Sequence, residues 1–111
     1  MSGDEDIVRL RHMLDAAREA VSFAQDRQRA DLDTDRQLAH ALVRCLEIIG
    51  EAASQVSQRT RDAHPEIDWS SIVGMRNRLI HAYFDVNLSI VWKTVTEELP
   101  QLLKDLARIL P

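Results

Sequence analysis

Apolar side chains recur at three- and four-residue spacing in successive stretches of the chain, which is the pattern of helices that bury one face. The first stretch predicts a helix over about residues 4–28. After the polar segment 29–34, Asp33 or Thr34 can cap a second helix. The apolar stripe of this second helix consists of Leu38, Leu42, Cys45, Leu46, Ile49, Ala53 and Val56.

Two further helices are predicted in the second half of the chain. Asp68 can cap a shorter third helix that ends near His81, and Asn87 can cap a last helix. Pro100 interrupts the apolar pattern of that last helix, which should kink or restart near Leu99. The pattern as a whole predicts an all-α bundle of four main helices, one of them short and one kinked.

Two features interrupt the helical patterns. Residues 59–68 contain a His-Pro pair and no apolar periodicity, so they should form the longest connection. Gly50 lies inside the second helix, where glycine costs about 1 kcal/mol relative to alanine. We therefore expect another backbone to pass close to Gly50.

Composition supports one helical domain spanning residues 1–111. Only 3 of the 111 residues are glycine and 3 are proline, which leaves little turn chemistry for a sandwich or barrel. Three of the first six residues are acidic, and no apolar run approaches the roughly 18 residues of a membrane span. The single cysteine, Cys45, excludes an intrachain disulfide, and a cytoplasmic protein without membrane attachment is expected.

Charge and histidine spacing narrow the possible chemistry. The net charge of -4 makes a broad electrostatic grip on nucleic acid implausible, so any RNA contact must be local. No histidine has another histidine or a cysteine three or four residues away, and no metal site or cofactor is expected. His12 and His40 lie on polar faces and are interpreted as solvated, while Cys45 is interpreted as a buried small hydrophobe.

Residues 76–83 concentrate two arginines, a histidine and a tyrosine without any acidic residue. A guanidinium that pairs with phosphate and an imidazole that titrates near neutrality suffice for metal-free RNA cleavage. Positions five apart on a helix lie about 140° apart, so Arg76 and His81 do not share a face. They could converge at a helix end or across a twofold axis. From the residue types alone, a solvated basic helix end is the more ordinary interpretation.

The spacing of Arg76, His81 and Tyr83 resembles the R-x4-H-x-Y motif of HepT-like toxins of the HEPN superfamily. The resemblance covers nearly the whole chain, because four ordered blocks match in sequence and spacing. These blocks are Leu46-Glu47-Ile48-Ile49-Gly50-Glu51-Ala52-Ala53, His64-Pro65-Glu66-Ile67-Asp68-Trp69, Gly74-Met75-Arg76-Asn77 and Ile90-Val91-Trp92.

The resemblance implies a homodimeric HEPN bundle that acts as a metal-independent endoribonuclease. It implies that Arg76 and His81 are catalytic at a cleft shared by two copies, with Asn77 in a supporting position. It also implies that Tyr83 is modified with AMP by a cognate minimal nucleotidyltransferase antitoxin, which would inhibit the toxin.

Two other classes of function remain open from the sequence. The chain could be a non-catalytic helical adaptor in which Arg76 and His81 make structural polar contacts. It could also be a nucleotide-binding accessory subunit of a nucleotidyltransferase, because the same arginine and histidine could hold a nucleotide phosphate.

Overall fold

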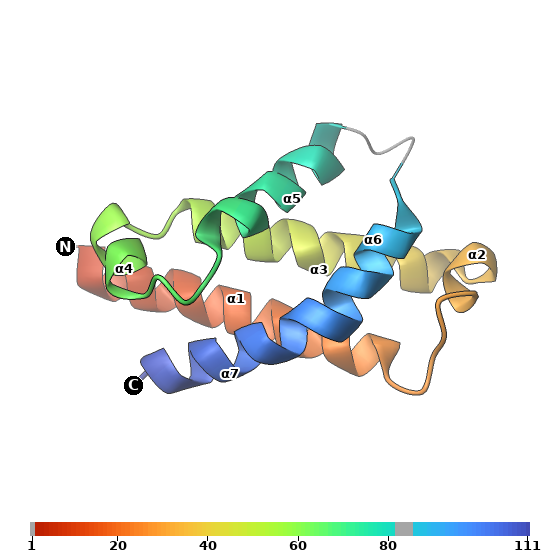
Figure 1. Cartoon of the computed structure of the whole chain (residues 1–111), viewed down its shortest axis with the longest axis horizontal. Helices are drawn as coiled ribbons and strands as arrows, with labels where there is room; N and C mark the ends of the chain where they lie inside the picture. The colour runs from red at the N-terminus through yellow and green to blue at the C-terminus, as the bar shows by residue number, and fades with distance from the viewer. Residues whose placement is uncertain (1, 82–85) are drawn as a thin grey trace.

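The computed structural model describes residues 2–81 and 86–111, which form helices and no strand (Figure 1). The two long helices, α1 (Ser2–Ala24) and α3 (Arg36–Ser54), pack against each other. Helix α5 (Trp69–His81) packs on α3, and α7 (Leu99–Ile109) packs on α1. Figure 1 shows both termini at the same end of this bundle. The predicted all-α class is confirmed.

The first helix ends earlier than the sequence predicts. Helix α1 stops at Ala24 rather than near residue 28, and Asp26 has a positive φ of 61°, a left-handed conformation that does not continue an α-helix. A short helix, α2 (Asp31–Thr34), follows. Asp35 then caps α3 by accepting a hydrogen bond from the amide of Leu38 at 3.0 Å. The predicted cap at Asp33 or Thr34 is wrong because those residues belong to α2.

The caps predicted for the second half of the chain are confirmed. Asp68 accepts from the Ser71 amide at 3.1 Å at the start of α5, which ends at His81. Asn87 accepts from the amides of Ser89 and Ile90 at 3.0 and 3.2 Å and begins α6 (Leu88–Lys93). Both helices therefore start where a short polar side chain satisfies the first free amides.

The last helical stretch changes its winding before Pro100. Helix α6 continues into a π-helical segment, η1 (Thr94–Glu98), and α7 restarts at Leu99 with the proline in its first turn. A proline in the first turn of a helix removes an N–H that has no partner within that helix. The predicted restart near Leu99 is confirmed.

The connection after α3 contains a helix that the sequence pattern missed. Residues Gln58–Ala63 form α4, capped by the Ser57 hydroxyl, which accepts from the Thr60 amide at 3.3 Å. None of the six residues of α4 is buried. A helix with no buried face has no apolar periodicity, which explains why the pattern predicted only a long connection over 59–68.

Asp6 fixes α4 to the beginning of α1. Its side chain is only 4% exposed and accepts from the Ser57 amide at 2.9 Å, from the Ser57 hydroxyl at 2.6 Å and from the Thr60 hydroxyl. Burial raises the pKa of this carboxyl, but the hydrogen bonds from Ser57 and Thr60 outweigh burial and hold the pKa below its usual value. Asp6 therefore has a structural role in joining α4 to α1.

The core lies between α1 and α3 and extends to α5 and α7. The predicted stripe of the second helix is buried, including Leu42, Ile49 and Cys45. Burial, with a smaller contribution from Glu19, raises the pKa of the Cys45 thiol to about 11, so the thiol stays protonated near neutrality. Across residues 2–81 and 86–111, no helix combines the length and apolar character needed to cross a membrane.

Candidate active site

Helix α5 brings Arg76 directly against Gly50 of α3. A Cβ atom built on Gly50 would lie 2.1 Å from Arg76 Cβ and 3.0 Å from the carbonyl oxygen of Ile72. No larger side chain fits at position 50 without moving α5. The predicted close approach at Gly50 is confirmed, and the chain that approaches is the one that carries Arg76.

The guanidinium of Arg76 is held by two partners. Its Nη1 donates to Oδ1 of Asn77 at 2.8 Å, and its Nη2 forms an ion pair with the carboxylate of Glu51 on α3. The Arg76 side chain is 27% exposed. An arginine has five N–H donors, and within the described residues these two contacts engage one nitrogen each. The guanidinium can therefore still donate to a phosphate.

Glu51 is a site residue that the sequence analysis missed. Glu51 is not part of the apolar stripe predicted for the second helix, and its side chain is 51% exposed. Nothing in that pattern shows that Arg76, 25 residues later, reaches the same point. The useful signal was Gly50, because an acidic residue next to a site of close helix approach is placed to meet the side chain that arrives there.

The other two residues of the motif are His81 and Tyr83. His81 is the last residue of α5, and the structure describes its backbone but not its side chain. Tyr83, the residue expected to be modified, lies outside the described residues. Five helical positions separate the Cα atoms of Arg76 and His81 by about 140° around the helix axis. The α5 backbone therefore does not align these two residues on one face.

An open groove surrounds Arg76 and Glu51, and we call it the Arg76 groove. It has a volume of about 520 Å³ and lies between α1, α3 and α5. Its lining residues are Arg9, His12, Arg44, Glu47, Ile48, Glu51, Ala52, Gln55, Arg76 and Ile80. His12 is exposed, as expected, yet it faces the same hollow as Arg76. Residues from three separate helices thus gather around the motif arginine.

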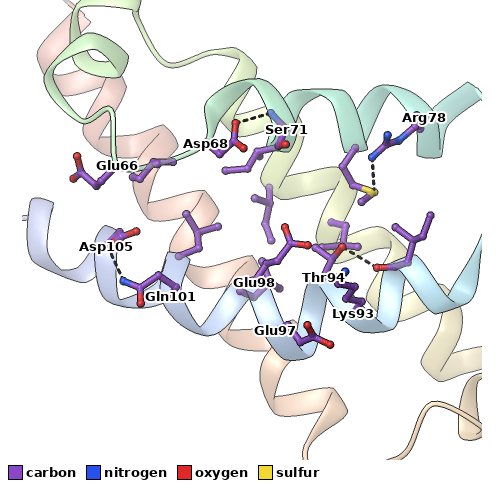
Figure 2. A pocket seen from close by; sticks show the side chains of 18 residues that line it. Glu66, Asp68, Ser71, Arg78, Lys93, Thr94, Glu97, Glu98, Gln101 and Asp105 are labelled. Atoms are coloured by element: carbon purple, nitrogen blue, oxygen red, sulfur yellow. Dashed lines mark hydrogen bonds between the residues drawn. The ribbon is translucent and has the colours of Figure 1, made fainter.

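Arg78 belongs to a different groove, on the other side of α5. This acidic groove, of about 540 Å³, lies between α5 and the α6–η1–α7 stretch (Figure 2). Arg78 donates to the sulfur of Met75 at 3.9 Å there, and Lys93 is the other cation of the lining. Five carboxylates line the same groove: Glu66, Asp68, Glu97, Glu98 and Asp105. The helix therefore splits the basic segment, and only Arg76 lies in a groove where cations outnumber acids.

The part of the chain that the structure describes contains no cluster of metal-ligating side chains. Within residues 2–81 and 86–111, no three or more His, Cys, Asp or Glu side chains are grouped so that they could hold a metal ion. In this helical bundle, a partly exposed guanidinium beside an open groove has the chemistry that pairs with phosphate oxygens.

Comparison with known families identifies the chain. The model of the ribonuclease HepT-like family matches residues 13–109, so the chain belongs to the HepT-like family of the HEPN superfamily. Membership makes the protein an enzyme of the endoribonuclease class, as the resemblance implied. The predicted HEPN-type bundle is likewise confirmed.

Relatives with ribonuclease names support this assignment. The chain is 45% identical over 80 residues to a protein of Caldanaerobacter subterraneus subsp. tengcongensis named as an RNase, covering 72% of this chain and 71% of the relative. It is 44% identical over 72 residues to a protein of Thermococcus cleftensis named as a ribonuclease HepT, covering 65% and 66% of the two chains. A Methanocaldococcus jannaschii protein named as an RNase is 33% identical over 93 residues, covering 84% and 85%. No solved structure matches the chain.

Proposed function

We propose that the protein is the toxin of a toxin-antitoxin system and that it cleaves RNA without a metal ion, using Arg76 and His81. The observation that carries the proposal is the Arg76 guanidinium, held by Glu51 and Asn77 beside an open groove in a HepT-like chain. Residues 1–111 would form one HEPN domain that acts in the cytoplasm.

The reaction follows from the chemistry of the two side chains. The His81 imidazole takes the proton of a ribose 2'-hydroxyl, and the resulting oxygen attacks the adjacent phosphorus. The bond from phosphorus to the 5'-oxygen breaks, and that oxygen receives a proton from the imidazolium or from water. The products are a 2',3'-cyclic phosphate and a free 5'-hydroxyl. Arg76 stabilises the charge on the phosphoryl oxygens, and Asn77 keeps the planar guanidinium oriented.

A homodimer would bring together Arg76 and His81, which do not share a face of a single α5 helix. Two copies related by a twofold axis can place the Arg76 of one chain near the His81 of the other. Gly74 supports this proposal, because it lies inside α5 and a Cβ built on it would meet nothing within 4 Å. Glycine in a helix is unfavourable unless a second backbone needs to approach. Sedimentation should give a dimer, and Gly74→Leu should weaken it; a wild-type monomer at micromolar concentration would refute this part.

Control by a cognate minimal nucleotidyltransferase antitoxin completes the proposal. The Tyr83 hydroxyl would attack the α-phosphorus of ATP, forming a phosphodiester to AMP and releasing pyrophosphate. The new phosphate would compete with RNA for Arg76, so inhibition needs no unfolding.

The decisive experiment compares RNA cleavage and growth arrest by the wild type, His81→Ala and Tyr83→Phe, each with and without the neighbouring antitoxin. His81→Ala should abolish cleavage while circular dichroism stays unchanged. Tyr83→Phe should cleave but resist inactivation by the nucleotidyltransferase and ATP. Intact-mass analysis should find AMP on the wild-type peptide that contains Tyr83.

The same experiment separates the other two classes of function. A wild type that never cleaves RNA would support a helical adaptor. A wild type that binds nucleotide and accelerates the transferase without cleaving RNA would support an accessory subunit. If the toxin is inhibited without added AMP, the antitoxin blocks it sterically and does not act by modification.

A further inference from the structure

We propose that the Arg76 groove is a second RNA-binding subsite, in which Arg9 and Arg44 bind backbone phosphates that flank the cleaved linkage. The ligand class is single-stranded RNA. This inference rests on the proposed ribonuclease function and adds the path that the substrate follows away from the reacting phosphate.

The three arginines of the groove come from three helices. Arg9 projects from α1, Arg44 from α3 and Arg76 from α5, and all three line the same hollow. His12 lies one helical turn beyond Arg9 on α1 and adds a further polar side chain to the wall. A chain of phosphates that reaches Arg76 through this hollow therefore passes the other two guanidinium groups.

The exposure and ion pairing of Arg9 and Arg44 leave both guanidinium groups able to bind an anionic ligand. Arg9 is half-buried, and it forms no ion pair with any carboxylate in the part of the chain that the structure describes. Arg44 is 72% exposed and pairs only loosely with Glu47, at 3.6 Å. Exposed pairs of this kind contribute little to stability. Both guanidinium groups can therefore turn to phosphate oxygens at small cost.

Charge also favours the Arg76 groove over the acidic groove as the RNA-binding surface. The Arg76 groove has three arginines against Glu47 and Glu51, whereas the acidic groove has Arg78 and Lys93 against five carboxylates. Because the chain has a net charge of -4, a polyanion should bind where positive side chains locally outnumber negative ones. The acidic groove, whose five carboxylates are labelled in Figure 2, would repel the same ligand.

The proposed dimer brings a second copy near Arg76, but that copy fits the Arg9 and Arg44 side of the groove less well. The centres of interfaces between identical chains are depleted in charged residues. Here five of the ten lining residues are arginine or glutamate, and the larger apolar side chains are those of Ile48 and Ile80. The groove is therefore assigned to RNA, and the oligomeric state becomes one readout of the test.

The test measures binding of a non-cleavable 2'-O-methyl RNA oligonucleotide by fluorescence anisotropy. The full-length variants are Arg9→Gln, Arg44→Gln and the double variant. The control is Arg18→Gln, because Arg18 is exposed on α1 nine positions from Arg9, about half a turn away around the helix, and does not line the groove.

We expect each single variant to weaken binding by about 3- to 10-fold, and the double variant by more. Each lost phosphate contact should also lower the slope of log affinity against log salt by about 0.7, the value for single strands. With cleavable RNA, the variants should raise KM more than they lower kcat. Arg18→Gln should match the wild type in all three measurements.

Three results would overturn the inference, and each points to a different cause. If the wild type cleaves RNA and both groove variants behave like Arg18→Gln, the subsite is wrong while the proposed function stands. If Arg9→Gln or Arg44→Gln dissociates a dimer in sedimentation, the groove is an interface between copies. If the wild type neither binds nor cleaves RNA, the proposed function itself fails.

Discussion

Two polar clusters join helices that are distant in sequence, and they do so in opposite ways. Asp6 is 4% exposed, and its carboxylate accepts from the amide and hydroxyl of Ser57 and the hydroxyl of Thr60. Arg76 is 27% exposed and uses two nitrogens on Asn77 and Glu51. The first cluster is closed to ligands, and the second is open.

The difference indicates what each cluster is for. A buried charge that is fully hydrogen-bonded resists exchange, because removing a partner leaves the rest unsatisfied in the interior. A partly exposed guanidinium with free donors can exchange a carboxylate for a phosphate of similar geometry. Changes at Asp6 should therefore affect stability, and changes at Arg76 should affect activity.

The largest expected effect is on catalysis. Arg76→Lys keeps the positive charge but loses the planar fork that binds two oxygens, and RNA cleavage should fall by about 100-fold or more. Thermal unfolding should change little, because the cluster is open to water. A lysine variant with full activity would reduce Arg76 to a general charge effect.

Gly50→Ala should lower both stability and activity, unlike changes at Asp6 or Arg76. The added Cβ would overlap Arg76 Cβ at 2.1 Å and push α5 away from α3. Overpacking of this kind costs about 1–3 kcal/mol, and the displaced guanidinium should also lose activity. Urea unfolding and RNA cleavage measure the two effects. Gly3→Ala is the matched control, because a Cβ built on Gly3 meets nothing within 4 Å and Gly3 does not line the Arg76 groove.

Asp6→Ala should lower stability alone. The substitution leaves the Ser57 amide and two hydroxyls without their acceptor, and we expect a loss of about 1–3 kcal/mol in the free energy of unfolding. Cleavage at a temperature where the variant is folded should equal that of the wild type. Asp4→Ala, at an exposed position of the same helix, serves as the control. Equal effects of both variants would remove the special role of Asp6.

The smallest effect is a pH dependence of stability. Because the folded pKa of Asp6 lies below its unfolded value, its contribution is complete above the unfolded pKa of about 4. That contribution is lost as the pH falls through the lowered folded pKa. Urea midpoints between about pH 2 and 6 should fall on acidification. The fall should be shallower in Asp6→Asn, and equal slopes would contradict the assignment.

Much of the fold could be predicted because its signals are local. The caps at Asp68 and Asn87 and the restart at Leu99 depend on groups within one helical turn, and the buried stripe of α3 depends on a periodic pattern. The site was predicted only in part. The motif marked Arg76 and Asn77, and Gly50 indicated a close approach without naming the partner.

Tertiary structure decided what local signals do not contain. The pairing of Glu51 with Arg76 spans 25 residues, and the binding of Asp6 to Ser57 spans 51. Both contacts depend on how two helices cross, which depends on the packing of many side chains together. The same packing placed Arg76 and Arg78 in different grooves and brought Arg9 and Arg44 beside the first. The sequence by itself determined the helices and the motif, whereas only the crossing of those helices determined which charges share a surface.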